Sequence, residues 1–333
     1  MKALLLKRYD KTNQFDFADI TKPTIKPNEM LVQVHAVGLN PVDNKIPTGA
    51  LKAVMKLELP VVMGSDLAGV VVEVGSRVTR FKQGDAVFAS IFDLGTGSLA
   101  EFAVVPESAA AIKPANLDFV QAASIPMVGL TSWQALKERA SLKAGQKVFI
   151  PAGSGGIGSF AIQLAKHLGA KVATTTSTGN VEMVKKLGAD EVIDYKKQEF
   201  EDVLQGYDVV LGTIEGGVIE KSLKILRPNS RIVSLVGPLD AAFASAKGLN
   251  FVLKFVFGLM SYKMNRLAKK SNAKYSFLFV HADGQQLAEI GKLLDAGHIV
   301  PIIDKIFPFE QTKEALAYLQ AGRAKGKVVV KVL

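Results

Sequence analysis

The chain has 333 residues, of which 48% are hydrophobic, and it carries a formal net charge of +10. This length allows two domains of ordinary size with well-buried cores. The absence of cysteine excludes disulfides, thiolate zinc sites and cysteine nucleophiles, and the four histidines lack the clustered spacing of metal ligands.

The N-terminal apolar run is too short for a signal peptide, and no uncharged run of 18 or more apolar residues follows it. We therefore expect a cytoplasmic protein without a membrane span. The positive charge can attract an anionic cofactor. Because no module of interleaved aromatic and basic residues accompanies this charge, we expect no specific nucleic-acid partner.

In chain order, the first third predicts a compact, barrel-like β domain, because glycines punctuate runs that alternate like half-buried strands. From residue 121 onward strand and helix patterns alternate, which predicts a parallel sheet with right-handed crossovers, an α/β doubly wound fold. The tail predicts two helices and a last strand that return to the first domain. The expected domains are 1–122, 123–280 and 281–333. The expected strands are 30–37, 67–74, 102–105, 148–150, 171–174, 191–193, 208–211, 231–236, 275–280 and 327–332, and the tail helices are 284–296 and 310–320.

The segment 147–170 carries the most informative motif. The apolar run 148–150 leads into a glycine-rich turn, and an amphipathic helix pattern follows at once. In such a turn the first glycine permits the bend, the second lets the backbone approach a pyrophosphate, and the third lets the helix pack on its strand. Both flanks are correct, so we predict a dinucleotide site. Its residues are Gly153, Ser154, Gly155, Gly156 and Ile157.

The end of the next strand indicates which dinucleotide binds. An acidic residue about 20 positions after the first glycine would accept a hydrogen bond from the ribose 2′-OH of NAD. Here Thr176 and Ser177 stand instead, and their hydroxyls can donate to a 2′-phosphate. Tyr195, at the end of the third strand, can add another donor. We therefore predict NADPH rather than NADH; the alternative is that Thr176 and Ser177 are ordinary loop hydroxyls.

Four segments resemble one family in order and nearly over the full length: 38–45, 63–75, 153–158 and 322–329. Through them the chain resembles the medium-chain dehydrogenase/reductase superfamily, in its zinc-independent quinone oxidoreductase and enone (2-alkenal) reductase branch. The resemblance implies a GroES-like β-barrel domain followed by a Rossmann domain. It also implies a homodimer or a monomer.

The chain departs from the zinc alcohol dehydrogenases of this superfamily at the metal ligands. Asn40 stands where zinc members have a cysteine, and Gly64-Ser65-Asp66 replaces a Gly-His-Glu. We therefore expect no zinc, and alcohol oxidation then loses its main source of charge stabilisation. The substrate must itself draw electrons, as a quinone or an α,β-unsaturated carbonyl does, because a few donors can stabilise the delocalised charge that hydride addition creates.

Matched positions imply two catalytic residues, Asn40 near the nicotinamide ribose and Lys45 near the cofactor and the substrate carbonyl, where an ammonium could stabilise an enolate. A solvated surface lysine is the equal alternative for Lys45. Asp43 is expected to be a helix cap or hydrogen-bond partner. Family members often have a lysine where this chain has Asn180, which puts more weight on Ser177 and Tyr195. The further cofactor-binding residues implied by the resemblance are Asn40, Lys45, Thr131, Asn180, Leu235, Val236, Phe277, Phe279 and Lys325.

These features favour an NADPH-dependent reductase of a small hydrophobic enone or quinone, with the α-carbon proton taken from water or an unidentified donor. An enoyl-thioester reductase is a close alternative, but that branch carries a tyrosine donor shortly after the Asn-Pro-x-Asp segment, and residues 45–60 contain no tyrosine. A non-catalytic NADPH-binding or RNA-binding protein is a third possibility. Its only support is the basic tract after Leu259.

The segment 241–274 is more apolar than a simple connection requires, and it then turns basic. Phe251, Phe255 and Leu259 recur at helical spacing. Burial against its own chain, for example as a lid over a hydrophobic pocket, is the expected arrangement for such a stripe. A subunit contact and a peripheral membrane contact by a basic amphipathic helix are the alternatives.

Overall fold

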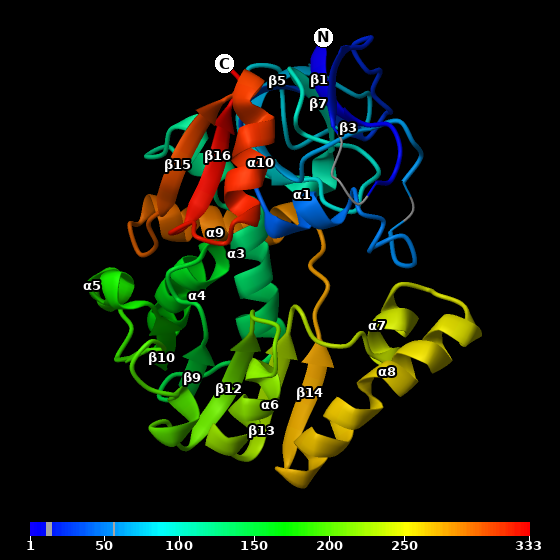
Figure 1. Cartoon of the computed structure of the whole chain (residues 1–333). Coiled ribbons are helices and arrows are strands. Elements are labelled where there is room, and N and C mark those ends of the chain that lie inside the picture. Colours follow the sequence, from blue (N-terminus) through cyan, green and yellow to red (C-terminus); the bar gives the residue numbers. More distant parts are fainter. Residues whose placement is uncertain (11–14, 56) are drawn as a thin grey trace. The chain divides into compact units, whose positions relative to one another are not determined.

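A computed structural model describes residues 1–10, 15–55 and 57–333 and divides them into two compact units (Figure 1). Unit 1 comprises Met1–Leu130 and His281–Leu333, and unit 2 comprises Thr131–Val280. The unit boundary falls within helix α3 (Pro126–Trp133), which continues as a π-helical stretch, Gln134–Arg139.

Antiparallel pairing dominates unit 1. One sheet has the order β2-β1-β4, and the other has the order β15-β16-β3-β5-β6-β8, with β7 also pairing with β3. Strand β16 runs antiparallel to β3 with Val329 opposite Gly38, so the end of the chain lies beside the segment that leads to Asn40. The strands are β1 (Lys2–Leu6), β2 (Asp16–Asp19), β3 (Glu29–Leu39), β4 (Val61–Val62), β5 (Asp66–Val74), β6 (Ala86–Ser90), β7 (Phe102–Pro106), β8 (Ala110–Ile112), β15 (Ile303–Pro308) and β16 (Lys327–Lys331).

Helices of unit 1 pack against these strands, α2 on β3, α9 on β8 and α10 on β16, and some of them begin at identifiable caps. Asn40 and Asp43 form a capping box at the start of α1, and the Asp283 side chain accepts the backbone N–H groups of Gln285 and Gln286 at the start of α9. Besides α3, the helices are α1 (Pro41–Lys45), α2 (Phe119–Ala123), α9 (Gly284–Asp295) and α10 (Thr312–Gln320), with 3-10 turns at Glu107–Ala109 and Phe309–Gln311.

Unit 2 is a six-stranded, wholly parallel sheet in the order β11-β10-β9-β12-β13-β14. The chain winds outward from β9 in one direction and then from β12 in the other, which confirms the predicted doubly wound fold. The strands are β9 (Lys147–Ile150), β10 (Lys171–Thr176), β11 (Glu191–Asp194), β12 (Tyr207–Gly212), β13 (Leu226–Ser234) and β14 (Ala273–Phe277). The helices are α4 (Gly156–His167), α5 (Val181–Lys186), α6 (Val218–Ser222), α7 (Ala241–Ala246) and α8 (Phe251–Lys270), with 3-10 turns at Thr178–Asn180, Phe200–Asp202 and Leu223–Ile225.

The order of this sheet fixes where a ligand can bind. Strand order reverses between β9 and β12, and open parallel sheets bind ligands beyond the carboxyl ends of their strands at such a point. The glycine-rich turn follows β9 directly, so it lies at that edge. The predicted closing strand is β14, which forms the lateral edge of the sheet opposite β11.

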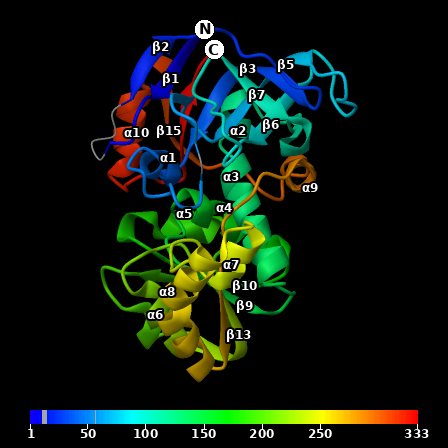
Figure 2. The same ribbon diagram turned by 90° about the vertical axis from the view of Figure 1, so that its right-hand side faces the viewer.

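Helix α8 corrects one expectation. Figure 2 shows it beside α7, and stacking of Phe243 on Phe257, at 6.1 Å between ring centroids, links the two helices. However, Phe251, Phe255 and Leu259 are exposed, so the prediction that this stripe packs against its own chain is wrong. The helix instead buries its opposite face. The buried residues on that face are Phe257, Ser261, Met264 and Ala268.

Candidate functional site

The turn between β9 and α4 assigns different tasks to its glycines. A Cβ added to Gly153 would lie 2.1 Å from the Thr174 hydroxyl oxygen, and one added to Gly158 would lie 2.3 Å from the carbonyl oxygen of Ala152. A Cβ on Gly155 would meet only that same carbonyl, at 3.4 Å, which is ordinary contact. The fold therefore requires the first and third glycines, whereas nothing within unit 2 requires the second. The backbone at Gly155 can accept a close-approaching phosphate.

The predicted hydroxyl residues lie together beside this turn. Thr176 Oγ1 donates to Ser154 Oγ at 3.0 Å, and Asn180 Nδ2 lies 3.3 Å from Ser154 Oγ and 3.2 Å from Ser177 Oγ. The Tyr195 N–H donates to the Thr176 carbonyl at 3.1 Å, and the Tyr195 side chain is exposed. Residues from the ends of β9, β10 and β11 thus form one polar surface next to Gly155.

This surface also includes an acid that the sequence analysis did not weigh. Asp194 ends β11, and its Oδ2 accepts from the Thr178 hydroxyl at 2.6 Å. That hydrogen bond, followed by the Lys196 N–H and the charge of Lys197, lowers the pKa of Asp194. The carboxylate is therefore ionised but already engaged by its own chain. Its place at the end of β11 was visible in the sequence, although its partners were not.

The remaining predicted residues of unit 2 are more buried. Thr131 is buried, and Leu235 and Val236 are half-buried after β13. Phe277 and Phe279 both contact the ring of Phe243, with centroids 5.5 and 5.4 Å apart. The Phe277 N–H donates to Asp240 Oδ2 at 3.0 Å, which leaves that amide committed within unit 2.

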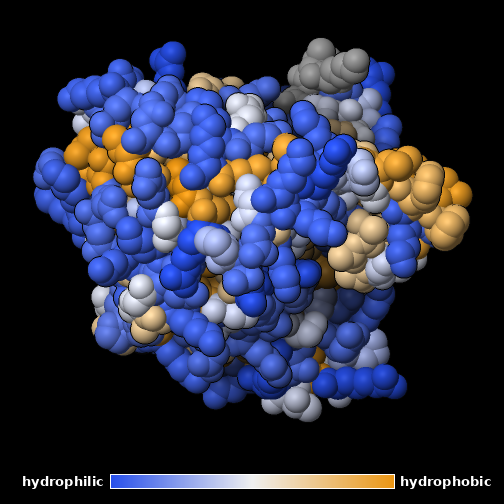
Figure 3. All heavy atoms as spheres, turned by 90° about the horizontal axis from the view of Figure 1, so that it is seen from below, coloured by the Kyte–Doolittle hydropathy of each residue, from blue (hydrophilic) through white to orange (hydrophobic). Residues whose placement is uncertain are grey.

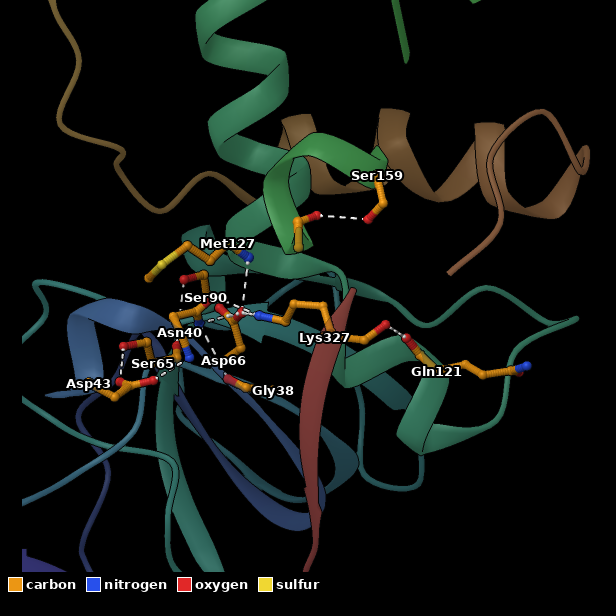
Figure 4. Close-up of polar contacts among 12 residues, drawn as sticks. Gly38, Asn40, Asp43, Ser65, Asp66, Ser90, Gln121, Met127, Ser159 and Lys327 are labelled. Carbon is orange, nitrogen blue, oxygen red and sulfur yellow. Dashed lines mark hydrogen bonds and ion pairs between the residues drawn. The ribbon is translucent and has the colours of Figure 1, made fainter. Parts of the chain in front are cut away.

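In unit 1, Asp43 caps the helix that follows Asn40. Its Oδ2 accepts from the Asn40 N–H and its Oδ1 accepts from the Ser65 hydroxyl, both at 2.7 Å (Figure 4). The expected capping role is confirmed. Burial raises the pKa of Asp43 to about 6, and the two hydrogen bonds oppose the shift.

The Asn40 side chain is held from both ends. Its Nδ2 donates to Asp66 Oδ2 at 2.9 Å and to the Gly38 carbonyl at 3.3 Å, and its Oδ1 accepts from Lys327 Nζ at 2.6 Å. Because both N–H bonds are used, a ligand can meet this side chain only at its acceptor, Oδ1. Asn40 can therefore accept a hydrogen bond from a hydroxyl but has no hydrogen to donate.

Asp66 and Lys327 form a buried ion pair, with 3.5 Å between Oδ2 and Nζ. The Met127 N–H also donates to Oδ2, at 3.1 Å, whereas Oδ1 has no hydrogen-bond partner among the described residues. Burial raises the pKa of Asp66, and the Lys327 charge opposes this; burial lowers the pKa of Lys327, and the charges of Asp66 and Asp43 oppose that. One ammonium thus stands between two buried carboxyl groups.

Lys327 was missed as a site residue, although it lies in the last family-like segment. The two lysines that were predicted, Lys45 and Lys325, are both exposed, Lys45 in the last turn of α1 and Lys325 just before β16. Their roles stay predictions. The signal that could have identified Lys327 is a lysine directly before the apolar run 328–330 of β16.

A small pocket of about 20 Å³ lies beside Asn40 and Asp43, within unit 1. It is bounded by Ser65, which bonds to Asp43, and by Ile46, which follows α1 directly. Its polar side chains are those of Ser65, Asp93 and Thr96. The other lining residues are Ile46, Met55, Leu57, Val61, Val62, Met63, Gly64, Ile91, Phe92 and Gly95.

Comparisons with known proteins agree with this geometry. A 2-methylene-furan-3-one reductase from Solanum lycopersicum and a chloroplastic NADPH-dependent alkenal/one oxidoreductase from Arabidopsis thaliana are each 36% identical over 94% of this chain and 74% of their own. The quinone oxidoreductase from Coxiella burnetii is 30% identical and superposes with a TM-score of 0.85, covering 100% of this chain and 99% of that one. The chain belongs to the medium-chain dehydrogenase/reductase superfamily, in its quinone oxidoreductase and alkenal/one reductase branch.

Family models match the alcohol dehydrogenase GroES-like domain at residues 26–115 and a zinc-binding dehydrogenase at 187–330. The protein is therefore an NAD(P)H-dependent oxidoreductase of the quinone and alkenal reductase type, with a GroES-like and a Rossmann-like unit. In the described part of the chain, no helix is both long and apolar enough to cross a membrane. The cytoplasmic location and the homodimer or monomer stay predictions.

The description of the second matching family mentions zinc, but the described residues do not fit a zinc ion. They contain no group of three or more histidine, aspartate or glutamate side chains placed to hold a metal. Asp66, the carboxylate at the aligned motif, already pairs with the Lys327 ammonium. A divalent ion about 4 Å from that ammonium would be repelled by about 8 kcal/mol at an effective dielectric constant of about 20.

Proposed function

We propose that this protein uses NADPH, without zinc, to reduce a quinone or the C=C bond of an α,β-unsaturated carbonyl. The observation that carries this proposal is the cluster of Asn40, Asp66 and Lys327, in which a buried ammonium accompanies the residues aligned with the zinc motif. That ammonium is committed to its own chain and cannot polarise a substrate as a Lewis acid does. A substrate that carries its own electron-withdrawing group fits such a site.

The nucleotide side of the proposal rests on the surface beside Gly155. NADPH, when bound, supplies a hydride from C4 of its nicotinamide. The uncovered backbone at Gly155 suits the pyrophosphate, and the hydroxyls of Ser177 and Tyr195 can donate to the 2′-phosphate. The ionised Asp194 nearby already accepts from Thr178 and pairs with Lys197, which reduces its repulsion of that phosphate.

Within unit 1, Asn40 Oδ1 is suited to accept from a ribose hydroxyl. The small pocket bounded by Ile46 and Phe92, with a volume of about 20 Å³, is suited to the apolar end of a substrate, because its mostly apolar walls favour an apolar ring edge or chain. The Ser65 hydrogen is committed to Asp43, so the Thr96 hydroxyl is the neutral donor on the lining that can face a developing enolate. Lys45 immediately precedes the pocket residue Ile46.

Among the residues that the structure describes, the pocket lining includes no tyrosine. This supports transfer of the α-carbon proton from water, and it weighs against an enoyl-thioester reductase that uses a tyrosine donor. A proton from water also suits quinones, whose reduced oxygens are protonated directly by solvent.

The test is a turnover panel with protein first shown to bind NADPH by titration. The panel contains short enones, 2-alkenals, a naphthoquinone and, as a contrast, primary alcohols with NADP. We expect enone or quinone turnover with NADPH preferred to NADH by at least about tenfold, and no loss of activity with a chelator. Binding of NADPH without turnover of any electrophile would remove the proposal, and metal-dependent alcohol oxidation would reverse it.

A further inference from the structure

Helix α8 exposes a large apolar surface in its N-terminal part. Its exposed side chains include Phe251 at 79%, Leu259 at 60% and Tyr262 at 62% of their full accessible area. Figure 3 shows apolar side chains gathered at the right-hand edge of the molecule, where the N-terminal end of α8 lies in Figure 1. The seven large apolar residues exposed on this helix are Phe251, Val252, Phe255, Val256, Leu259, Met260 and Tyr262.

The fold of unit 2 does not need these seven side chains. Packing on the opposite face already fixes the helix, through Phe257 against Phe243 and through the buried Met264 and Ala268. The Asn250 side chain caps the helix by accepting from the Leu253 N–H at 3.0 Å. Large apolar groups that are mostly exposed and face solvent together indicate an interaction surface.

The charge of the same segment is one-sided. Residues 241–282 contain six lysines and one arginine and no acidic residue, so they supply seven of the chain's net ten positive charges. Four exposed cations follow the apolar part within α8: Lys263, Arg266, Lys269 and Lys270. The helix is therefore apolar at its N-terminal end and cationic at its C-terminal end.

These features select one kind of partner. A second copy of this chain would bring two strongly positive segments together, which is unfavourable. An acidic protein or a nucleic acid would satisfy the cations but would leave the Phe251 and Phe255 rings against polar groups. An anionic phospholipid surface offers phosphates to the cations and acyl chains to the rings.

We propose that α8 docks this protein onto the surface of an anionic phospholipid membrane. The apolar N-terminal end enters the boundary between headgroups and acyl chains, and Lys263, Arg266, Lys269 and Lys270 contact the phosphates. The helix lies on the membrane and does not cross it. This docking is independent of the proposed reductase chemistry.

The test is flotation of the full-length protein with vesicles of phosphatidylcholine alone or of equal parts phosphatidylcholine and phosphatidylglycerol. We expect binding to the anionic vesicles only, reduced but not abolished when the salt concentration rises from 0.05 to 0.5 M, because screening weakens the ionic part and leaves the apolar part. Lys269→Glu/Lys270→Glu should lower the bound fraction at least about tenfold. Its matched control, Lys185→Glu/Lys186→Glu, changes the same charge at the end of α5 in the same unit and should bind like the parent.

The apolar contribution is tested with Phe255→Ser, which should reduce binding about tenfold at high salt. Ile112→Ser, at a similarly exposed apolar residue of unit 1, is the control and should have no effect. Retained NADPH binding shows that each variant is folded. The proposal is overturned if anionic vesicles do not bind, if both charge-reversal variants behave alike, or if Phe255→Ser only dissolves a dimer seen by sedimentation.

Discussion

Replacing Lys327 with methionine should destabilise unit 1 strongly and in a pH-dependent manner. Methionine has nearly the same length and can fill the same buried space, so the change removes the charge with little loss of volume. What remains is the Asp66 carboxylate, fully buried, with its Oδ2 deprived of the ammonium, and an Asn40 Oδ1 without its 2.6 Å donor.

The expected magnitude follows from these contacts. Breaking a buried ion pair by removing one partner costs about 3–5 kcal/mol, because the other charge stays buried without compensation. The lost hydrogen bond to Asn40 belongs to the same cost and is not added to it. For comparison, Lys292→Met removes an exposed pair with Glu289 and should cost at most about 1 kcal/mol.

The pH dependence has a definite sign. Burial already raises the pKa of Asp66, and loss of Lys327 removes the charge that opposes this rise. A carboxyl group whose pKa is higher in the folded state contributes stability below its unfolded pKa and loses it as pH rises through the folded value. The cost of Lys327→Met should therefore be smaller at pH 5 than at pH 8.

Hydrogen exchange of the β3 and β16 amides is the suitable assay, because it reports the opening free energy of unit 1 separately from unit 2. The double variant Lys327→Met/Asp66→Asn removes both charges and should recover most of the loss. Equal costs at both pH values, or a double variant less stable than Lys327→Met, would refute the assignment of a buried ion pair.

Three further predictions concern the ligand sites. Gly155→Ala should weaken NADPH binding at least about tenfold while thermal stability stays unchanged. Gly153→Ala should instead cost about 1–3 kcal/mol of stability, because the added methyl group clashes with the buried Thr174. Equal effects of the two substitutions on NADPH binding and on stability would contradict the separate roles of these glycines. Asn180→Lys should tighten NADPH binding about tenfold and leave NADH unchanged, as measured by titration, and equal gains for both nucleotides would point away from the 2′-phosphate. Leu57→Gln should raise the KM of a hydrophobic enone about fivefold and leave the KM of NADPH unchanged. A change in the KM of NADPH alone would remove this pocket as the substrate site.

The alternating part of the fold was predictable because its signals are local. Apolar runs and glycine turns predicted the strands of unit 2 and the site after β9, and the structure has a strand at each predicted position. The polar surface of Ser154, Thr176 and Ser177 followed from the same reasoning, since parallel strands end at one edge, whereas Asn180 was implied by the family resemblance.

Two features were not predictable from the sequence: the buried face of α8 and the burial of Lys327. Contacts with distant parts of the chain decide both. The face of α8 that becomes buried is selected by α7 and β14, and the more hydrophobic stripe is the one left in solvent. Lys327 is buried because β16 pairs with β3, which brings it to a residue 287 positions earlier in the chain. Lysine is among the least buried residue types, so burial of Lys327 was not expected, and the family resemblance led to the exposed Lys45 and Lys325 instead.

The position of Lys327 also explains why the Asn40 segment can keep a buried acid without a metal. A carboxylate at residue 66 needs a positive partner, because an isolated buried charge would be neutralised by a shifted pKa. The last strand supplies that partner as a fixed ammonium, and the same ammonium sets which way the Asn40 amide points. Lys327 therefore determines that the Asn40 side chain can act toward a ligand only as a hydrogen-bond acceptor. Changes at residue 327 should alter recognition of the ribose hydroxyl even though that lysine is not itself available to the ligand.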